Sequence, residues 1–310
     1  MFVKAQNTLK ITAAVAAGLI ALTGCTTASQ DTAENQPAGA SAFDLSTVAK
    51  DDALAAEVPA AISSKGTLIV GSDTTYAPAE FLGGNDGQTP MGYDVDMAKA
   101  IGATLGLKVE VKTADFTGII PSLGPKYDLG ISSFFITEER SKAANFVSYF
   151  QAGTQWVTQK GNPKSIDIED LCGKTVGVQT GTFQEDPDIS GRSAKCVSEG
   201  KSAINVVSLK KQTDVTTRLV NGGLDAMAAG SITTAYAITQ TEGSLETIGT
   251  LYGASPLGIA VDKNDTKLAD VVAKAVNKLI ADGSYKKILD TWGNGDGAIT
   301  TAEVNPAVDK

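Results

Sequence analysis

The sequence predicts an α/β fold with two similar lobes, each built on a mainly parallel sheet. Short apolar runs that favour strands alternate with segments whose apolar residues recur at helical spacing. This alternation restarts after Gly153, so the pattern occurs twice along the chain. Strands that alternate with helices are typical of parallel sheets flanked by helices. Two such units in one chain favour two lobes with a cleft between them.

The first half of the chain alternates three expected strands with three expected helices. Residues 93–105 favour a helix because apolar residues recur there at helical spacing. Thr137 offers a capping hydroxyl to a later helix, with Glu138 and Glu139 in the first turn, where the helix dipole favours acids. The expected order is strand 67–71, a turn-rich stretch 72–90, helix 93–105, strand 108–111, helix 116–123, strand 128–132 and a helix from 137.

The second half repeats this alternation and ends in two helices. Gly283 separates these two helices, and Pro59, far upstream, ends a short helix expected over 51–58. The expected order is strand 175–178, loop 179–181, strand 204–209, helix 212–221, strand 225–229, strand 257–261, helix 267–281 and helix 284–292.

The N-terminus has the layout of a bacterial lipoprotein signal. A short apolar run over 11–21 follows Lys4 and Lys10 and is well short of the ~20 residues that a membrane-spanning helix needs. Leu22-Thr-Gly-Cys25 follows in the position of a lipobox. We therefore expect a signal peptide over 1–24, lipidation of Cys25, and a protein anchored outside the cytoplasm to the cell membrane. The alternative is a plain secretory signal in which Cys25 has no role.

The composition after residue 24 suits a folded receptor behind a flexible segment. Residues 26–43 consist mainly of small and polar residues that cannot bury enough surface to fold, and we expect a flexible tether over 25–60. Loss of the two lysines in 1–24 changes the net charge from −9 to −11. A surface this acidic repels nucleic acid.

The chain contains no histidine. This excludes Ser-His-Asp and Cys-His catalysis and removes the commonest zinc ligand. With Cys25 lipidated, Cys172 and Cys196 remain in an oxidising compartment, and we expect them to form a disulfide, with two free thiols as the alternative.

Between residues 68 and 293 the chain carries an ordered set of short motifs. They are Leu68-Ile-Val-Gly-Ser-Asp73 with Tyr76-Ala-Pro78, Gly92-Tyr-Asp-Val-Asp96, Ile120-Pro-Ser-Leu123, Tyr127-Asp-Leu-Gly-Ile-Ser-Ser133, Thr137-Glu-Glu-Arg140, Asn145-Phe146, Leu171-Cys-Gly-Lys-Thr-Val-Gly-Val178 with Thr180-Gly-Thr182, Asn221-Gly-Gly-Leu-Asp225, Asp282-Gly-Ser-Tyr-Lys-Lys-Ile288 and Trp292-Gly293. In this order they resemble the family 3 extracytoplasmic solute-binding proteins, the polar amino acid receptors of ABC importers.

The resemblance implies a two-lobed fold of the periplasmic-binding-protein type II. Two crossing segments, expected near 152–156 and 250–256, would join the lobes, with ligand in the cleft between them. The implied boundaries are 61–154 for the first part of lobe 1, 155–252 for lobe 2, and 253–310 for the C-terminal part of lobe 1 with the tail.

The resemblance also implies that Arg140 pairs with a carboxylate of the ligand. Guanidinium is planar and always charged, and it offers two parallel donors to a carboxylate. Thr182 lies after a strand of the second lobe, where free backbone N–H groups would hold the same carboxylate. The alternative for Arg140 is an ordinary arginine in the first turn of a solvent-exposed helix. The alternative for Thr182 is a hydroxyl that only caps a helix.

Further ligand contacts are implied at five positions. Asp73 matches an aspartate that contacts the side chain of the ligand, and Tyr76 matches an aromatic residue that lines the site. Phe116 matches a residue that stacks on the ligand. Ser132 and Ser133 end a strand at the edge of the cleft, where their hydroxyl and backbone groups accept hydrogen bonds from an ammonium or another polar group. The alternative for Phe116 is that it only packs in the core. The alternative for the two serines is that they only end a strand and do not contact the ligand.

Two positions depart from the family pattern. Phe135 stands where a serine or threonine usually contacts the ligand. Gly230, followed by Ser231, stands where an aspartate usually pairs with the ligand's α-ammonium. A buried ammonium without an anion is unfavourable. Either another carboxylate such as Asp73 serves, or the ligand lacks a free α-amine. With Phe183 also near, an apolar, aromatic or N-substituted ligand is compatible with the site, helped by cation–π contacts.

The tail contains a sequence that mimics part of a calcium loop. Asn294-Gly-Asp-Gly-Ala-Ile-Thr-Thr-Ala-Glu303 has Gly297 and Ile299 in register, but position one would be Trp292, which offers no side-chain oxygen. We interpret it as a structural tail and expect neither a metal nor another cofactor.

The sequence thus favours a monomeric, lipid-anchored receptor that captures an amino acid or a derivative with a carboxylate and delivers it to an ABC permease. One alternative is an enzyme on the same scaffold, similar to cyclohexadienyl dehydratases. Without histidine, only Asp73, Asp115, Glu80 or a lysine would remain for its proton transfer. A surface protein that binds its ligand for sensing or adhesion, without transport, is the second alternative.

Overall fold

The structure is a computed structural model that describes residues 43–308. Its strands are β1 (Thr67–Ser72), β2 (Thr75–Tyr76), β3 (Glu80–Gly83), β4 (Thr89–Met91), β5 (Lys108–Thr113), β6 (Leu129–Phe135), β7 (Ala144–Gln159), β8 (Thr175–Gln179), β9 (Asn205–Leu209), β10 (Ala226–Gly230) and β11 (Leu245–Asp262). Its helices are α1 (Asp52–Glu57), α2 (Ala60–Lys65), α3 (Tyr93–Leu105), α4 (Phe116–Ile119), α5 (Glu138–Ala143), α6 (Ser190–Ser198), α7 (Gln212–Val220), α8 (Ser231–Gln240), α9 (Thr266–Ala281) and α10 (Ser284–Thr291). Short helical turns are η1 (Leu45–Thr47), η2 (Ile120–Ser122), η3 (Gln184–Ile189) and η4 (Gly295–Gly297).

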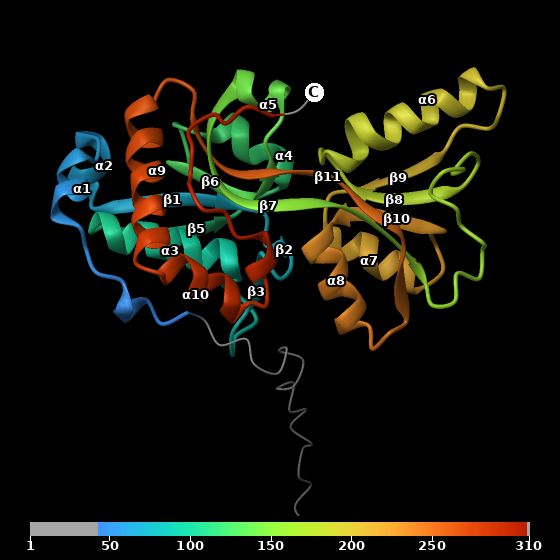
Figure 1. The fold of residues 1–310 in the computed structure, drawn as a ribbon, viewed down its shortest axis with the longest axis horizontal. Coiled ribbons are helices and arrows are strands. Elements are labelled where there is room, and N and C mark those ends of the chain that lie inside the picture. Colours follow the sequence, from blue (N-terminus) through green and yellow to red (C-terminus); the bar gives the residue numbers. More distant parts are fainter. Residues whose placement is uncertain (1–42, 309–310) are drawn as a thin grey trace, which may run out of the picture. The chain divides into compact units, whose positions relative to one another are not determined.

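Eight strands form one sheet in the order β5-β1-β6-β11-β7-β10-β8-β9. At one end β5, β1 and β6 pair in parallel, and at the other end β10, β8 and β9 do the same. In the middle, β11 and β7 are antiparallel to each other and to their outer neighbours. We call the part with β1, β5 and β6 lobe 1 and the part with β8, β9 and β10 lobe 2 (Figure 1).

The two long strands β7 and β11 run through both lobes (Figure 1). Their pairing is irregular around Tyr252, which is where the sheet passes from one lobe to the other. The two expected crossing segments therefore lie inside continuous strands. The expected boundaries of the lobes near 154 and 252 stay a prediction, because each strand belongs to both lobes.

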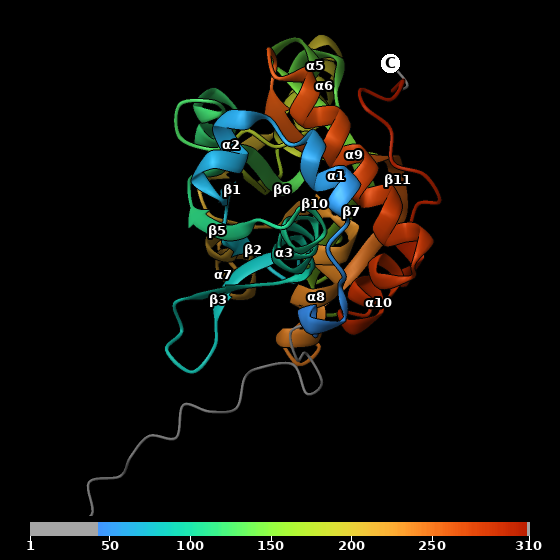
Figure 2. The ribbon, with the colours of Figure 1, turned by 90° about the vertical axis from the view of Figure 1, so that its left-hand side faces the viewer.

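Helices flank the sheet in each lobe, as parallel strands require. In lobe 1, α3 packs against α9 and α10, and α1 lies beside α9 (Figures 1 and 2). In lobe 2, α7 packs on β8 and α8 packs on β7 (Figure 1). This arrangement confirms the α/β fold with two lobes that the alternation of strands and helices predicts.

Two local expectations differ from the structure in lobe 1. The turn-rich stretch 72–90 contains the short strands β2 and β3, which with β4 form a second, antiparallel sheet. The helix expected over 116–123 is split into α4 and η2, because Pro121 lies where an α-helix would need its backbone N–H.

The N-terminal expectation differs from the structure after residue 42. The signal peptide, Cys25 and the first part of the tether lie outside the described residues. Residues 43–60, expected to belong to the tether, pack on lobe 1 and contain η1 and α1, and α1 confirms the short helix expected over 51–58. Phe43 and Val58 bury their apolar side chains in its core, and the Phe43 N–H donates to Asp96 Oδ2 over 3.1 Å. Among the described residues, no helix combines the length and the apolar character needed to cross a membrane.

A disulfide joins Cys172 and Cys196, which confirms the expected pairing. It connects the segment before β8 to helix α6 across a sequence separation of 24 residues. Cys196 is buried and packs with Trp156, Val176 and Ile189 in the core of lobe 2. The cross-link therefore ties a surface helix to the strands beside the cleft.

Replacing both cysteines with serine is expected to lower the free energy of unfolding by about 3 kcal/mol. The reason is that the reduced, unfolded chain regains the freedom of a loop of this length. Denaturant unfolding of the double variant measures the loss, and the wild-type protein unfolded with a reducing agent is the control, since it should lose a similar amount. A loss below about 1 kcal/mol in both would contradict the prediction.

Candidate functional site

The predicted ligand-binding residues come from segments that meet between the two lobes. Lobe 1 supplies the loop after β1, the start of α4, the end of β6, and α5, whereas lobe 2 supplies the loop after β8 and the start of α8. Most of these residues line one small cavity, together with Gln179 and Gln184: Tyr76, Phe116, Ser132, Ser133, Phe135, Arg140, Thr182 and Phe183. The volume of this cavity is about 10 Å³, which is room for about one water molecule.

Arg140 lies at the contact between the lobes. Thr137 caps α5 by accepting a hydrogen bond from the Arg140 N–H, which fixes the start of the helix. The guanidinium donates from Nη1 to the Phe135 carbonyl and from Nη2 to the Gly181 carbonyl of lobe 2, both over 2.8 Å. Its Cζ lies 5.3 Å from the centre of the Phe116 ring. Burial lowers the pKa of Arg140 to about 10, so this group keeps its charge at neutral pH.

Tyr76 and Gly230 connect the lobes at a second point. The Gly230 N–H, at the end of β10, donates to Tyr76 Oη over 2.8 Å. A Cβ atom at position 230 would lie 2.8 Å from the same oxygen, so the tyrosine hydroxyl fills the space that a side chain there would need. Burial raises the pKa of Tyr76 to about 12, and the hydroxyl stays neutral. Ser231 begins α8 next to this contact but does not line the small cavity.

Asp73 lies behind the cavity, where four hydrogen bonds occupy its carboxylate. Oδ1 accepts from the Thr75 N–H and hydroxyl, while Oδ2 accepts from the Phe116 N–H and from Gln179 Nε2 of lobe 2. The Gln179 bond is 2.8 Å long. Burial raises the pKa of Asp73 against the effect of these donors.

Gln179 is a candidate ligand contact that our reading of the sequence missed. It ends β8, is 1% exposed and lines the cavity, and its Oε1 has no hydrogen-bond partner. A buried acceptor without a partner is unfavourable, and a donor on a ligand would satisfy it. The sequence predicts a loop from residue 179, and no pattern there indicates a buried amide.

Ser132 and Ser133 connect the cavity to a buried pair of acids. The Ser132 hydroxyl donates to Glu80 Oε1 over 2.8 Å, and the Ser133 N–H donates to Asp94 Oδ2 over 2.8 Å. Ser133 has a φ of 47°, a left-handed conformation that is uncommon for serine and is found at functional sites. Tyr149 donates its hydroxyl to Asp94 on the far side.

The surroundings of Glu80 favour its protonated form in the folded protein. Its complete burial and the neighbouring charge of Asp94 raise its pKa well above the usual value of 4.5. Because the folded state binds this proton more tightly than the unfolded chain does, the stabilisation is present below pH 4.5 and is lost as the pH rises toward the folded pKa. A neutral glutamine does not titrate.

Glu80→Gln is therefore expected to flatten the dependence of stability on pH. Its free energy of unfolding, relative to that of the wild-type protein, should rise as the pH increases from 5 to 8, a window that starts just above the ordinary glutamate pKa of 4.5. Denaturant unfolding at several pH values measures this difference. A difference that stays constant over the window would show that Glu80 does not hold its proton.

The remaining contacts between the lobes surround the small cavity. The Phe135 and Phe183 rings stack across it with centres 5.8 Å apart. Gln212 donates its N–H to Thr75 Oγ1 over 3.3 Å, and Lys210 forms an exposed ion pair with Asp115 over 3.2 Å. These contacts hold the lobes together around the cavity, whose volume leaves no room for an amino acid unless the lobes separate.

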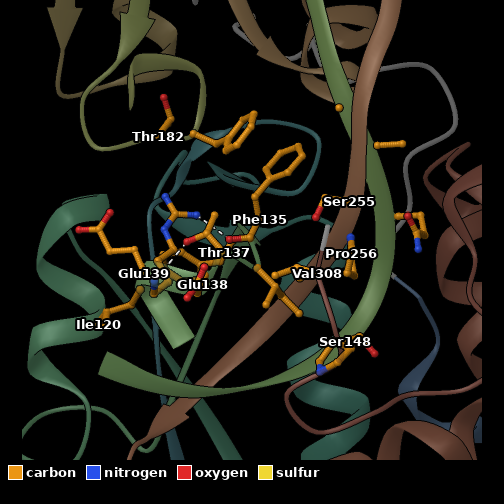
Figure 3. Close-up of a pocket in the computed structure, with 18 of the residues that line it drawn as sticks. Ile120, Phe135, Thr137, Glu138, Glu139, Ser148, Thr182, Ser255, Pro256 and Val308 are labelled. Atoms are coloured by element: carbon orange, nitrogen blue, oxygen red, sulfur yellow. Dashed lines mark hydrogen bonds between the residues drawn. The ribbon is translucent and has the colours of Figure 1, made fainter. Parts of the chain in front are cut away.

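A larger, open groove of about 1690 Å³ adjoins the same residues. Figure 3 shows Thr182, Phe135 and Thr137 on it, with Ser255 and Pro256 of β11 and Val308 of the C-terminal segment. Arg140 lines both the groove and the small cavity. The groove is the open side from which the arginine can be approached.

Comparison with known proteins agrees with this geometry. The sequence profile of the bacterial extracellular solute-binding proteins, family 3, matches residues 68–295. The chain belongs to this family. The match covers both lobes and all the candidate ligand-binding residues named above.

Similar members of the solute-binding family are amino-acid-binding proteins. The chain is 35% identical over 251 residues to the arginine-binding protein ArgT of Corynebacterium glutamicum, covering 81% of this chain and 82% of that protein. It is 36% identical to the solved structure of an ancestral arginine-binding protein bound to arginine, with a TM-score of 0.67 and coverage of 74% and 98% of the two chains.

A second similar solved structure is that of an ancestral amino-acid-binding protein described as a precursor of cyclohexadienyl dehydratase. It is 31% identical, with a TM-score of 0.64, and the match covers 75% of this chain and 97% of that one. These three proteins confirm the expected two-lobed, periplasmic-binding-protein-like fold and the resemblance to amino acid receptors.

Proposed function

We propose that this protein is the substrate-binding component of an ABC importer and that it captures an amino acid or an amino-acid-like carboxylate between its lobes. Membership of the solute-binding family and the similarity to amino-acid-binding proteins support the class of ligand. The lobes separate to admit the ligand and then close over it. The closed form presents the surface that the membrane permease recognises.

The observation that carries this proposal is the position of Arg140. Its guanidinium lies between the lobes and donates to two backbone carbonyls, one from each lobe. No ion pair within the described residues includes it. Guanidinium has five N–H donors, so further donors remain for a ligand. A carboxylate is the anion that this planar group binds best with two parallel hydrogen bonds.

The rest of the site completes the proposed receptor. Tyr76, Phe116, Phe135 and Phe183 supply apolar walls, and the hydroxyls of Ser132, Ser133 and Thr182, with Ser231 beside them, supply polar contacts. Asp73 and Gln179 accept donors of the ligand. The protein acts as a monomer and needs neither catalysis nor a cofactor. A lipid on Cys25 anchors it to the outer face of the cell membrane.

A thermal-shift screen of amino acids tests this function. A receptor gains about 2.7 kcal/mol of stability when the ligand is present at a hundredfold excess over its Kd. Its ligand should be recovered chemically unchanged, as mass spectrometry after incubation would show. A ligand that is converted to product would identify an enzyme instead. Undiminished uptake of the best ligand by a strain that lacks this chain would favour a sensory or adhesive role.

A further inference from the structure

The charges around the small cavity limit how many charges a ligand can bring. Of the ten described residues that line the cavity, one is a cation, Arg140, and none is a carboxylate. Three carboxyl groups lie directly behind the lining, those of Asp73, Glu80 and Asp94, and that of Asp94 is fully buried and accepts hydrogen bonds from Ser133 and Tyr149. Asp115, at the rim, is exposed and paired with Lys210.

Asp73 is the carboxylate behind the small cavity whose hydrogen bonds change when the lobes separate. Of its four hydrogen bonds, one comes from Gln179 of lobe 2, and that bond breaks when the lobes separate. The other three come from Thr75 and Phe116 of lobe 1 and remain. A cation of the ligand can therefore take the place of the Gln179 amide at Oδ2 as the lobes open and close again.

Glu80 offers no second negative charge. It is completely buried, and the Ser132 hydroxyl stands between it and the cavity with its hydrogen donated to Oε1. Its other charged and titratable neighbours are Asp94, Asp73 and the tyrosines 76, 93 and 149, none of which is a base. Burial and the neighbouring Asp94 both raise the pKa of Glu80 and so favour its neutral form.

No anion stands at Gly230 either. Its N–H is donated to Tyr76 Oη, and the hydroxyl oxygen lies 2.8 Å from where a Cβ atom would be. A nitrogen of the ligand at this position meets a neutral hydroxyl and not a carboxylate. A second cation would be desolvated there without a counter-charge, which is unfavourable.

We propose that the ligand is a carboxylate with a single positive charge, net neutral at pH 7, because the small cavity has one guanidinium in its lining, Arg140, and one carboxylate behind it, Asp73, that loses its lobe 2 donor when the lobes separate. This inference rests on the proposed function and narrows its substrate class. It distinguishes the protein from the relatives that bind arginine, because free arginine carries two positive charges. Amino acids with an uncharged side chain belong to the class, as do basic amino acids whose α-nitrogen is acylated.

Isothermal titration calorimetry of the full chain tests the inference after any copurified ligand is removed by partial unfolding and dialysis. The probes are the common L-amino acids, L-citrulline and Nα-acetyl-L-arginine; the last two resemble arginine but lack one of its cations. The tightest ligand should be net neutral, and arginine and lysine should bind about tenfold more weakly or worse.

Each outcome of this titration is decisive. If arginine, lysine, aspartate or glutamate binds tightest, the inference is wrong, while the proposed function stands. If none of the probes binds, the proposed function fails as well. A net-neutral ligand as the tightest binder supports both.

A pair of variants that match in size but differ in charge tests the role of position 230. Gly230→Asp combined with Tyr76→Phe places a carboxylate in the space that the hydroxyl leaves, and Gly230→Asn with Tyr76→Phe is the uncharged control of the same size. The ratio of the Kd of Nα-acetyl-L-arginine to that of L-arginine should rise about tenfold in the aspartate variant relative to the asparagine variant. Equal ratios would overturn the assignment of position 230, and if either variant fails to fold, the wild-type titration still decides.

Discussion

Replacing Arg140 with glutamine is expected to weaken ligand binding about 100-fold or more. A hydrogen bond to a charged group contributes about 1.5–3 kcal/mol where water is excluded, and a guanidinium makes two to one carboxylate. Arg140 is charged at neutral pH, with a pKa of about 10, and lies at the contact between the lobes. Glutamine keeps a polar side chain but loses the charge and the paired donors.

Calorimetry with the best ligand measures this loss of affinity, and two further variants serve as a comparison and a control. Arg140→Lys keeps the charge without the planar fork and should fall between the wild-type protein and the glutamine variant. Arg218→Gln removes an exposed arginine on α7, in lobe 2, and should leave the affinity unchanged. An Arg140→Gln protein that folds and binds the ligand with full affinity would refute the role of this arginine.

Trp156→Ala is expected to lower the free energy of unfolding by about 4 kcal/mol, the largest stability effect that we predict for a single substitution. Trp156 lies on β7 and is completely buried in the core of lobe 2. Its Nε1 donates to Tyr252 Oη of β11 over 2.8 Å, and the Arg192 guanidinium lies 5.8 Å above its ring. Alanine would leave a large cavity in the core of lobe 2, beside one of the two strands that join the lobes.

Trp156→Phe separates the two parts of this effect. Phenylalanine keeps most of the apolar volume but loses the hydrogen bond to Tyr252, so this variant should lose markedly less stability than the alanine variant. Denaturant unfolding measures both variants, and circular dichroism of the folded proteins checks that the fold is retained. Equal losses for the two variants would mean that the hydrogen bond, and not the packing, dominates.

The fold was largely predictable because its strands and helices follow regular patterns. The strands β1, β5, β6, β8, β9 and β10 and the long helices α3 and α9 appear where apolar runs and helical spacing place them. The small sheet of β2, β3 and β4 was missed, since its strands have two to four residues and lie among turn-forming residues. β7 was missed as a strand, and of β11 only residues 257–261 were expected, because a strand that passes between two lobes changes its surroundings midway.

The candidate site was predictable where single residues stand next to recognisable motifs, and less so elsewhere. Arg140 follows a capping threonine, and most of its predicted neighbours gather around one cavity. Gln179 was missed because its importance comes from contacts with lobe 1, and only the packing of the lobes reveals them. The protonated state of Glu80 likewise depends on Asp94, which is close in space but 14 residues away along the chain.

The most direct test of the central claim is a crystal structure of the protein with its tightest-binding ligand. The account predicts that the ligand lies between the lobes, with its carboxylate oxygens about 2.8 Å from the guanidinium nitrogens of Arg140. A bound ligand whose carboxylate contacts other residues, with Arg140 still hydrogen-bonded only to the carbonyls of Phe135 and Gly181, would contradict it.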